Sequence, residues 1–225
     1  MMEKIYKLLE KPYAVVWVML LTPLLGFIDR NFVFFAGLGV VFLLLKRSKY
    51  DWSKFGLAEG FSAKTVLKAL LISLLCFIVF SMLDPILEKY FGPFDLSSLE
   101  DIKGNLMGYV VLMIIMWIFA AFGEELLFRG YYMKGLAELL GNGNRAWILS
   151  AVMISVYFGV SHAYQGLSGV ISVTIWSLFV SFIFNKNRNN LFLLVLVHGI
   201  TDSIGITLLY LDRGNFISDW ILQMI

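Results

Sequence analysis

Five ionisable side chains stand in stretches of the sequence that are otherwise nearly uncharged. Glu124 and Glu125 lie in FGEELLFRG, His162 lies in VYFGVSHAY, and His198 and Asp202 lie in LLVLVHGITD. Ionisable groups inside an apolar segment each cost roughly 2.5–3.5 kcal/mol to insert into a membrane, which makes them candidates for function. Carboxylates and imidazoles are also frequent general acids and bases. Together these residues could activate a water molecule as a nucleophile.

Helical spacing sorts these groups into pairs. Glu125 and Arg129 are four residues apart, so on a helix they share a face and can form an ion pair. Glu124 is turned about 100° from Glu125 and therefore has no partner on its own helix, which suits a general base. Asp202 follows His198 by four residues and could fix the tautomer of its imidazole or hold it protonated.

A strong turn signal, GNGN at residues 141–144, lies midway between Glu124 and His162. Two antiparallel helices joined at this turn would place the carboxylate and the imidazole at the same depth, where they could share a water molecule. Bringing His198 to that depth requires the turn to project from the membrane, which we adopt as a working assumption.

The composition shows what kind of elements must position these residues. Of the 225 residues, 60% are hydrophobic and 15% are charged, and the mean hydropathy is +0.82, whereas a soluble domain has about 25% charged residues. The net charge of +2 comes from cations scattered in short loops, which disfavours nucleic-acid binding. A single cysteine, Cys76, excludes a disulfide framework and a cysteine-based metal site. The chain is therefore expected to lie in a lipid bilayer.

We predict an all-helical fold with seven membrane spans in one domain, residues 1–225. The spans are Pro12 to Ile28, Phe32 to Leu45, Thr65 to Leu83, Asn105 to about Leu140, Ala146 to His162, Gly166 to Phe184, and Leu191 to Leu211. Residues 1–104 hold the N-terminal spans, residues 105–211 the catalytic core spans, and residues 212–225 an interfacial tail. The first span is retained, because no small-residue cleavage site of a signal peptide follows Ile28.

Charged residues between the spans predict the orientation. Cations follow the second and sixth spans, and acidic residues follow the third: Lys46, Arg47, Lys49, Lys54, Lys186 and Arg188 against Asp84, Glu88, Asp95, Glu100 and Asp101. The positive-inside bias then places the N-terminus in the cytoplasm and, with seven spans, the C-terminus outside. The predicted location is the plasma membrane of a prokaryote.

Three spaced motifs occur in order along the second half of the chain. They are EExxxR at Glu124 to Arg129, FxxxH at Phe158 and His162, and HxxxD at His198 and Asp202. In this combination the sequence resembles the CPBP family, which comprises type II CAAX prenyl endopeptidases and bacteriocin-processing relatives. The resemblance covers about residues 106–211.

The resemblance implies helices around a water-filled cavity in which a peptide bond is hydrolysed. Glu124 with His162 would activate the attacking water, and His198 with Asp202 would stabilise the tetrahedral oxyanion. Glu125 and Arg129, together with Phe158, would give structural support. Many family members have Asn at the position of Asp202, and an ionised Asp cannot donate to an oxyanion. Its role here is therefore better described as orienting His198.

The residues also permit other functions. Glu124, His162 and His198 could bind zinc, since histidines and a carboxylate can make a catalytic site, although no HExxH motif is present. A proton-coupled transporter or a non-catalytic scaffold is a further alternative, but inverted repeats are not evident. Ser161 beside His162 is a poor serine nucleophile, because adjacent residues on a helix point about 100° apart. Expected partners are the lipid bilayer and a peptide or prenylated peptide substrate, with no cofactor in the favoured interpretation.

Overall fold

The computed structural model describes residues 2–214, 221 and 223, and this part of the chain is helical apart from turns and loops. The N-terminal elements are α1 (Met2–Leu9), α2 (Ala14–Leu21), η1 (Thr22–Phe27), α3 (Arg30–Arg47), η2 (Trp52–Phe55) and α4 (Ala63–Phe91). The elements after α4 are η3 (Ser97–Ile102), α5 (Leu106–Ile115), η4 (Met116–Met133), α6 (Lys134–Leu139), α7 (Asn144–Ser161), η5 (Ala163–Gln165), α8 (Gly166–Lys186) and α9 (Leu191–Tyr210). The all-helical fold class is thus confirmed.

Side-chain caps begin the long helices where the sequence offers them. Ser62 accepts from the backbone N–H of Thr65 at the start of α4, and Asn105 accepts from that of Gly108 at the start of α5. Asn190 caps α9 in the same way. Each cap satisfies a backbone donor that a helix leaves unpaired at its first turn. Two of the helices that lead to candidate site residues, α5 and α9, therefore begin at a capping side chain, whereas α7 begins at Asn144 without one.

One continuous helix runs through α5, η4 and α6, residues 106–139, and its central part η4 is wound as a π-helix. It carries the EExxxR motif. π-Helical segments are rare and often occur at functional sites. The helix ends at Leu139 and α7 begins at Asn144, so the turn predicted at residues 141–144 is confirmed.

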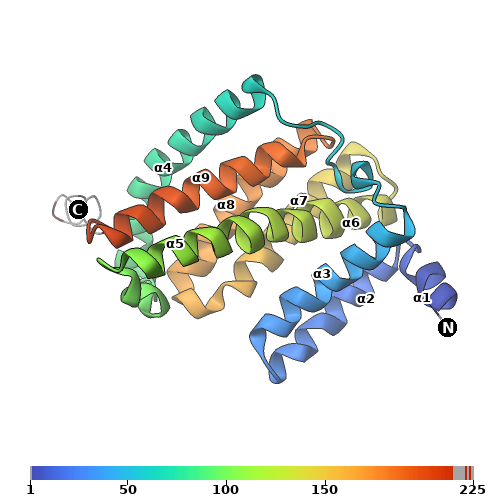
Figure 1. Cartoon of the computed structure of the whole chain (residues 1–225), viewed down its shortest axis with the longest axis horizontal. Helices are drawn as coiled ribbons and strands as arrows, with labels where there is room; N and C mark the ends of the chain where they lie inside the picture. Colours follow the sequence, from blue (N-terminus) through green and yellow to red (C-terminus); the bar gives the residue numbers. More distant parts are fainter. Residues whose placement is uncertain (1, 215–220, 222, 224–225) are drawn as a thin grey trace.

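The helices pack so that α9 lies between α4 and the α5–α6 helix, while α7 and α8 lie together as an antiparallel pair (Figure 1). The hairpin of α2 and α3 flanks this group on one side. α9 contacts η4 and α4, and α8 contacts α7, α4 and α9. The three family motifs thus come from three helices of one bundle, η4, α7 and α9.

The loop before α4 fixes the turn between α8 and α9. Both Asn187 and Asn190 donate side-chain hydrogen bonds to the carboxylate of Glu59, and Leu191 N–H donates to the carbonyl of Gly56 at 2.8 Å. Gly56 adopts φ +84°, and a Cβ there would lie 2.8 Å from the carbonyl oxygen of Arg188, so the position requires glycine. These contacts set the height at which α9 begins.

Four helices in the described part of the chain are long and apolar enough to cross a membrane, Ala63–Phe91, Leu106–Leu139, Ala163–Lys186 and Leu191–Tyr210. The number rises to five if Glu3–Leu9 and Ala14–Phe27, bent by 96°, form one broken span. The predicted count of seven is therefore not confirmed. Polar or charged end residues shorten the apolar part of the two remaining predicted spans: α3 ends in Lys46 and Arg47, and α7 begins with Asn144 and Arg145.

The end of α4 differs from the prediction for the third span. Asp84 and Glu88 lie inside α4, which continues to Phe91, rather than in a loop after the third span. The predicted span ended too early because α4 continues past Asp84 to Phe91. The tail predicted for residues 212–225 falls mostly outside the described residues.

Multi-pass insertion in a membrane is supported, and exposed apolar side chains of α4 such as Leu67, Leu71 and Met82 provide a lipid-facing surface.

Candidate active site

A buried carboxylate joins the first motif to the third. Glu125 Oε1 accepts a hydrogen bond from Arg129 Nη1 at 2.9 Å and lies 2.9 Å from His198 Nδ1. Glu125 and Arg129 have no exposed surface, and His198 is 5% exposed. The ion pair predicted from the spacing of Glu125 and Arg129 is confirmed. The contact from η4 to α9 was not predicted, because His198 had been paired only with Asp202.

This geometry defines the orientation of the His198 ring. An ionised carboxylate can only accept hydrogen bonds, so the Nδ1 atom facing Glu125 must carry a proton and donate it. The Nε2 atom then points to the other side, 3.4 Å from Asp202 Oδ2 and 4.0 Å from Glu124 Oε2. Three carboxylates from two helices therefore surround one imidazole.

The carboxylates near Nε2 are the accessible ones. The side chain of Glu124 is 22% exposed and that of Asp202 is 35% exposed, whereas Glu125 has no exposed surface. Glu124 also interacts electrostatically with Asp202 and Arg129. A substrate or water molecule entering from outside the bundle would thus meet Glu124 and Asp202 first.

Besides its ion pair with Glu125, Arg129 makes three hydrogen bonds to α8. Its Nη2 donates to Ser177 Oγ at 2.7 Å and to the Ser177 carbonyl at 3.3 Å, and its Nε donates to Ser181 Oγ at 3.4 Å. The guanidinium lies over the rings of Phe158 at 4.8 Å and Trp176 at 5.6 Å. Hydrogen bonds and aromatic faces of this kind offset the cost of burying a cation.

His162 lies at the C-terminal end of α7, and its Nδ1 is 2.8 Å from the carbonyl oxygen of Phe158. A carbonyl only accepts, so Nδ1 carries the proton and Nε2 is the basic nitrogen. The Phe158 ring is 4.6 Å from the His162 ring and 6.5 Å from the His198 ring. His162 interacts electrostatically with His198 and Asp202. The described residues show no ion pair between Glu124 and His162, so their proposed cooperation through water remains a prediction.

Ser161 approaches His162 more closely than the helical spacing implied. Its Oγ is 3.2 Å from His162 Nδ1, and it donates to the carbonyl of Phe158 at 2.6 Å. Because that nitrogen itself donates to the same carbonyl, it cannot take the proton of Ser161. The contact therefore gives no activated serine.

Two buried polar atoms in the cluster have no hydrogen-bond partner among the described residues. They are Glu125 Oε2, an acceptor, and Trp176 Nε1, a donor. The Trp176 ring lies 4.6 Å from that of His198 in a T-shaped arrangement. Trp176, Ser177 and Ser181 were missed by the sequence analysis. Ser177 and Ser181 are four residues apart and therefore share a face of α8, and this spacing was the available signal.

Glu124, His162 and His198 are the potential zinc ligands of the site. In the part of the chain that the structure describes, no group of three or more His, Cys, Asp or Glu side chains is arranged to hold a metal ion. The Nδ1 atoms of both histidines are engaged, His198 Nδ1 with Glu125 and His162 Nδ1 with the Phe158 carbonyl, whereas their Nε2 atoms remain potential metal donors. The zinc alternative therefore stays a prediction.

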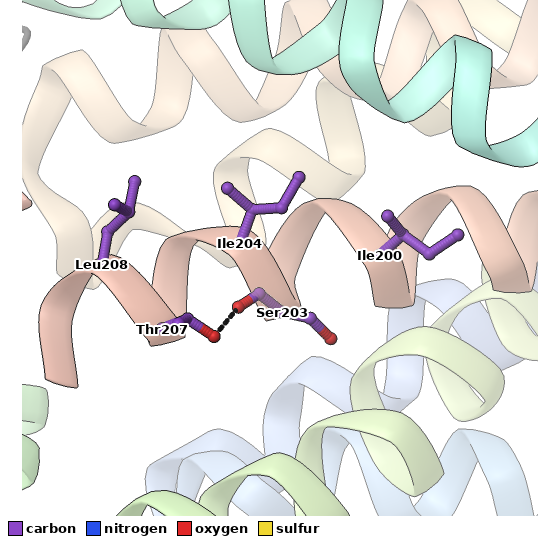
Figure 2. Close-up of a pocket in the computed structure, with 5 residues that line it drawn as sticks. All are labelled: Ile200, Ser203, Ile204, Thr207 and Leu208. Carbon is purple, nitrogen blue, oxygen red and sulfur yellow. Dashed lines mark hydrogen bonds between the residues drawn. The ribbon is translucent and has the colours of Figure 1, made fainter. Parts of the chain in front are cut away.

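A pocket of about 340 Å³ lies along α9 and is lined by Ile200, Ser203, Ile204, Thr207 and Leu208 (Figure 2). Ile200 and Ile204 each follow a site residue by two positions, which places them about 200° around the helix from His198 and Asp202. The pocket therefore opens on the other face of α9. It is not the water-filled cavity that was expected around the site, and that cavity is not confirmed.

The fold and the site define a multi-pass helical membrane protein with a buried cluster of acids and histidines. Residues 106–204 match the family model of the Rce1-like type II CAAX prenyl endopeptidases. The expected resemblance to the CPBP family is confirmed for this segment, which contains all three motifs. The match supports a membrane protease and suggests a CAAX-protease-like intramembrane endopeptidase. No curated protein and no solved structure matches the chain.

Proposed function

We propose that this protein is an intramembrane endopeptidase that hydrolyses a peptide bond with a water molecule activated by Glu124 and His162, without a metal ion. The observation that carries the proposal is the position of Glu124. Its carboxylate lies 4.0 Å from His198 Nε2, is partly accessible, and belongs to a segment that matches a protease family. A general base must be able to reach both its substrate and its catalytic partners.

The proposed reaction follows from the free atoms of the site. Glu124, assisted by His162 Nε2, takes a proton from water as the water oxygen attacks the scissile carbonyl carbon, and the carbonyl oxygen becomes an oxyanion. His198 Nε2 stabilises that charge when both of its ring nitrogens are protonated. The C–N bond then breaks, and the proton held by the base passes to the leaving amine. Asp202, 3.4 Å from Nε2, orients the ring from the accessible side.

The substrate is proposed to be a peptide, either prenylated or unmodified, that reaches the site from the membrane. A water-accessible cavity around Glu124 and Asp202 belongs to this proposal, since both side chains retain exposed surface. The residues that support the reaction without touching substrate are Glu125, Arg129 and Phe158.

A cleavage assay tests the proposal. Purified protein in detergent is incubated with a panel of prenylated and unprenylated peptides, and wild type is compared with Glu124→Gln and His162→Ala. We expect both changes to reduce turnover by at least about 10²-fold, the usual size of a general-base contribution, with the thermal unfolding temperature nearly unchanged. The matched control is Glu138→Gln, which changes an exposed carboxylate further along the same helix.

The same assay includes a further variant, Asp202→Asn, and a measurement in the presence of a metal chelator. Asp202→Asn should retain activity, because an amide can still contact Nε2 of His198. Activity should also persist in a metal chelator, and inactivation that added zinc reverses would favour the zinc alternative. Undiminished cleavage by Glu124→Gln would remove the catalytic assignment altogether.

A further inference from the structure

Ser177 lies outside the three motifs, yet it makes the shortest hydrogen bond to the buried arginine. The bond from Arg129 Nη2 to its Oγ is 2.7 Å, compared with 2.9 Å from Nη1 to Glu125 and 3.4 Å from Nε to Ser181. The carbonyl of Ser177 accepts from the same Nη2 at 3.3 Å. One residue of α8 thus supplies two acceptors for one end of the guanidinium.

We propose that Ser177 is a positioning residue of the active site, which acts through Arg129 and Glu125 to hold the His198 imidazole with Nε2 toward Glu124 and Asp202. The proposal deepens the proposed function and, in its kinetic part, rests on it. The steps are continuous contacts of 2.7, 2.9 and 2.9 Å, from Ser177 to Arg129, to Glu125 and to His198.

The residues that make these contacts are buried, so bulk water cannot replace a hydrogen bond that is lost. Ser177, Arg129 and Glu125 have no exposed surface, and His198 is 5% exposed. In such an environment a lost hydrogen bond is not replaced by one to bulk water, so the remaining groups shift to find new partners. Removing the Ser177 hydroxyl therefore disturbs the position of the Arg129 guanidinium.

The disturbance reaches His198 because Glu125 is held through one oxygen. Oε1 receives both Arg129 and His198, while Oε2 has no partner among the described residues. When the guanidinium moves, the carboxylate has no second anchor to keep Oε1 opposite the ring. The Nδ1 proton then loses its fixed acceptor, and the ring can take another tautomer or rotate.

The hydrogen bond from Arg129 to Ser181 is weaker than the one to Ser177, so the two serines can be compared by the effect of removing each hydroxyl. Ser181 Oγ is 3.4 Å from Arg129 Nε and 3.5 Å from Ser155 Oγ, both long for hydrogen bonds. Ser150 on α7 is also fully buried, but its hydroxyl has no hydrogen-bond partner among the described residues. Loss of the hydroxyl should thus affect His198 most at residue 177, less at residue 181, and not at residue 150.

Nuclear magnetic resonance can read this order directly, since the chain contains only two histidines. The protein is labelled with ¹⁵N-histidine, and His162→Gln assigns the two ring systems. We expect wild-type His198 to show a slowly exchanging Nδ1 proton. Ser177→Ala should lose this signal or shift the ring nitrogens, Ser181→Ala should give a smaller change, and Ser150→Ala should match wild type.

Kinetics give a second readout that simple packing would not move. Because Ser177 has no exposed surface through which it could contact a substrate, kcat of Ser177→Ala should fall about three- to tenfold, the value of about one hydrogen bond, with KM changed less than about twofold. Ser177→Thr, which keeps the hydroxyl, should restore most of the kcat. Should Ser177→Ala fail to fold, Ser181→Ala against Ser150→Ala carries the same comparison.

The outcomes separate the two proposals. Ring signals of His198 that are identical in Ser177→Ala and wild type would overturn the positioning role, as would an equal change in Ser150→Ala. If wild type cleaves no peptide while Ser177→Ala still changes the His198 signals, the proposed function fails and the positioning role stands.

Discussion

Two arginines of this chain form ion pairs with glutamates at the same distance in opposite surroundings. Arg129 Nη1 is 2.9 Å from Glu125 with both side chains fully buried, and Arg47 Nη2 is 2.9 Å from Glu3 with side chains 40% and 56% exposed. Distance alone would rank them equally. Burial separates them, because water screens the exposed pair and cannot replace a partner of the buried one.

The two arginines also differ in the helices that they connect. Arg47 also approaches Glu10 at 3.4 Å and lies over the Tyr6 ring at 5.7 Å, so it ties the short helix α1 to α3. Arg129 is held by three hydrogen bonds from α8 in addition to its pair with Glu125. The first is a peripheral contact of the N-terminal helices, while the second connects three helices of the site.

The largest effect is expected from Arg129→Met. It leaves the carboxylate of Glu125 buried without its cation, and breaking a buried pair in this way costs roughly 3–5 kcal/mol. The free energy of unfolding, measured by denaturant titration in mixed micelles, should fall by that amount. The matched double variant Glu125→Leu/Arg129→Met should lose less than the single variant, since no uncompensated charge remains. Equal losses would show that packing, rather than charge, sets the stability here.

A smaller effect is expected where α7 and α8 approach each other. A Cβ on Gly159 would lie 2.7 Å from the carbonyl oxygen of Val170, so Gly159→Ala forces the helices apart and should cost about 1–3 kcal/mol. The control is Gly39→Ala on α3, where a Cβ meets nothing within 4 Å. That variant should be stabilised by about 0.5–1 kcal/mol, because alanine favours a helix over glycine. Thermal unfolding of both variants measures the contrast, and a destabilised Gly39→Ala would contradict it.

The smallest effect is expected from Arg47→Ala. Exposed ion pairs contribute only about 0–1 kcal/mol, so the unfolding free energy should change within that range. The change should shrink further at high salt, since screening already weakens the pair in the wild type. A loss as large as that of Arg129→Met would invalidate the comparison between the two pairs.

The sequence predicted contacts within one helix well. Glu125 with Arg129 and His198 with Asp202 are both spaced by four residues, and both pairs lie within 4 Å in the structure. Helix geometry alone brings such residues together, whatever the rest of the fold does. The predicted turn at residues 141–144 and the family resemblance of the motif segment are likewise confirmed.

Contacts between helices could not be predicted in this way. Glu125 contacts His198 because η4 and α9 have a particular rotation and relative height. Ser177 and Ser181 contact Arg129 because α8 has a particular rotation and height relative to η4. The predicted count of seven spans is not confirmed, because α3 and α7 carry charged residues near their ends and the first apolar stretch is bent. A hydropathy pattern reports apolar length but not how a helix is bent.

The sequence by itself determined that this chain is a helical membrane protein with a few costly ionisable groups, because apolar composition and four-residue spacing act locally. Only the tertiary structure decided which of these groups meet. It placed Glu125, rather than Asp202, at Nδ1 of His198, and it added Ser177 of α8 to the buried network. The physical reason is that rotation and register of packed helices depend on side chains far apart in the chain.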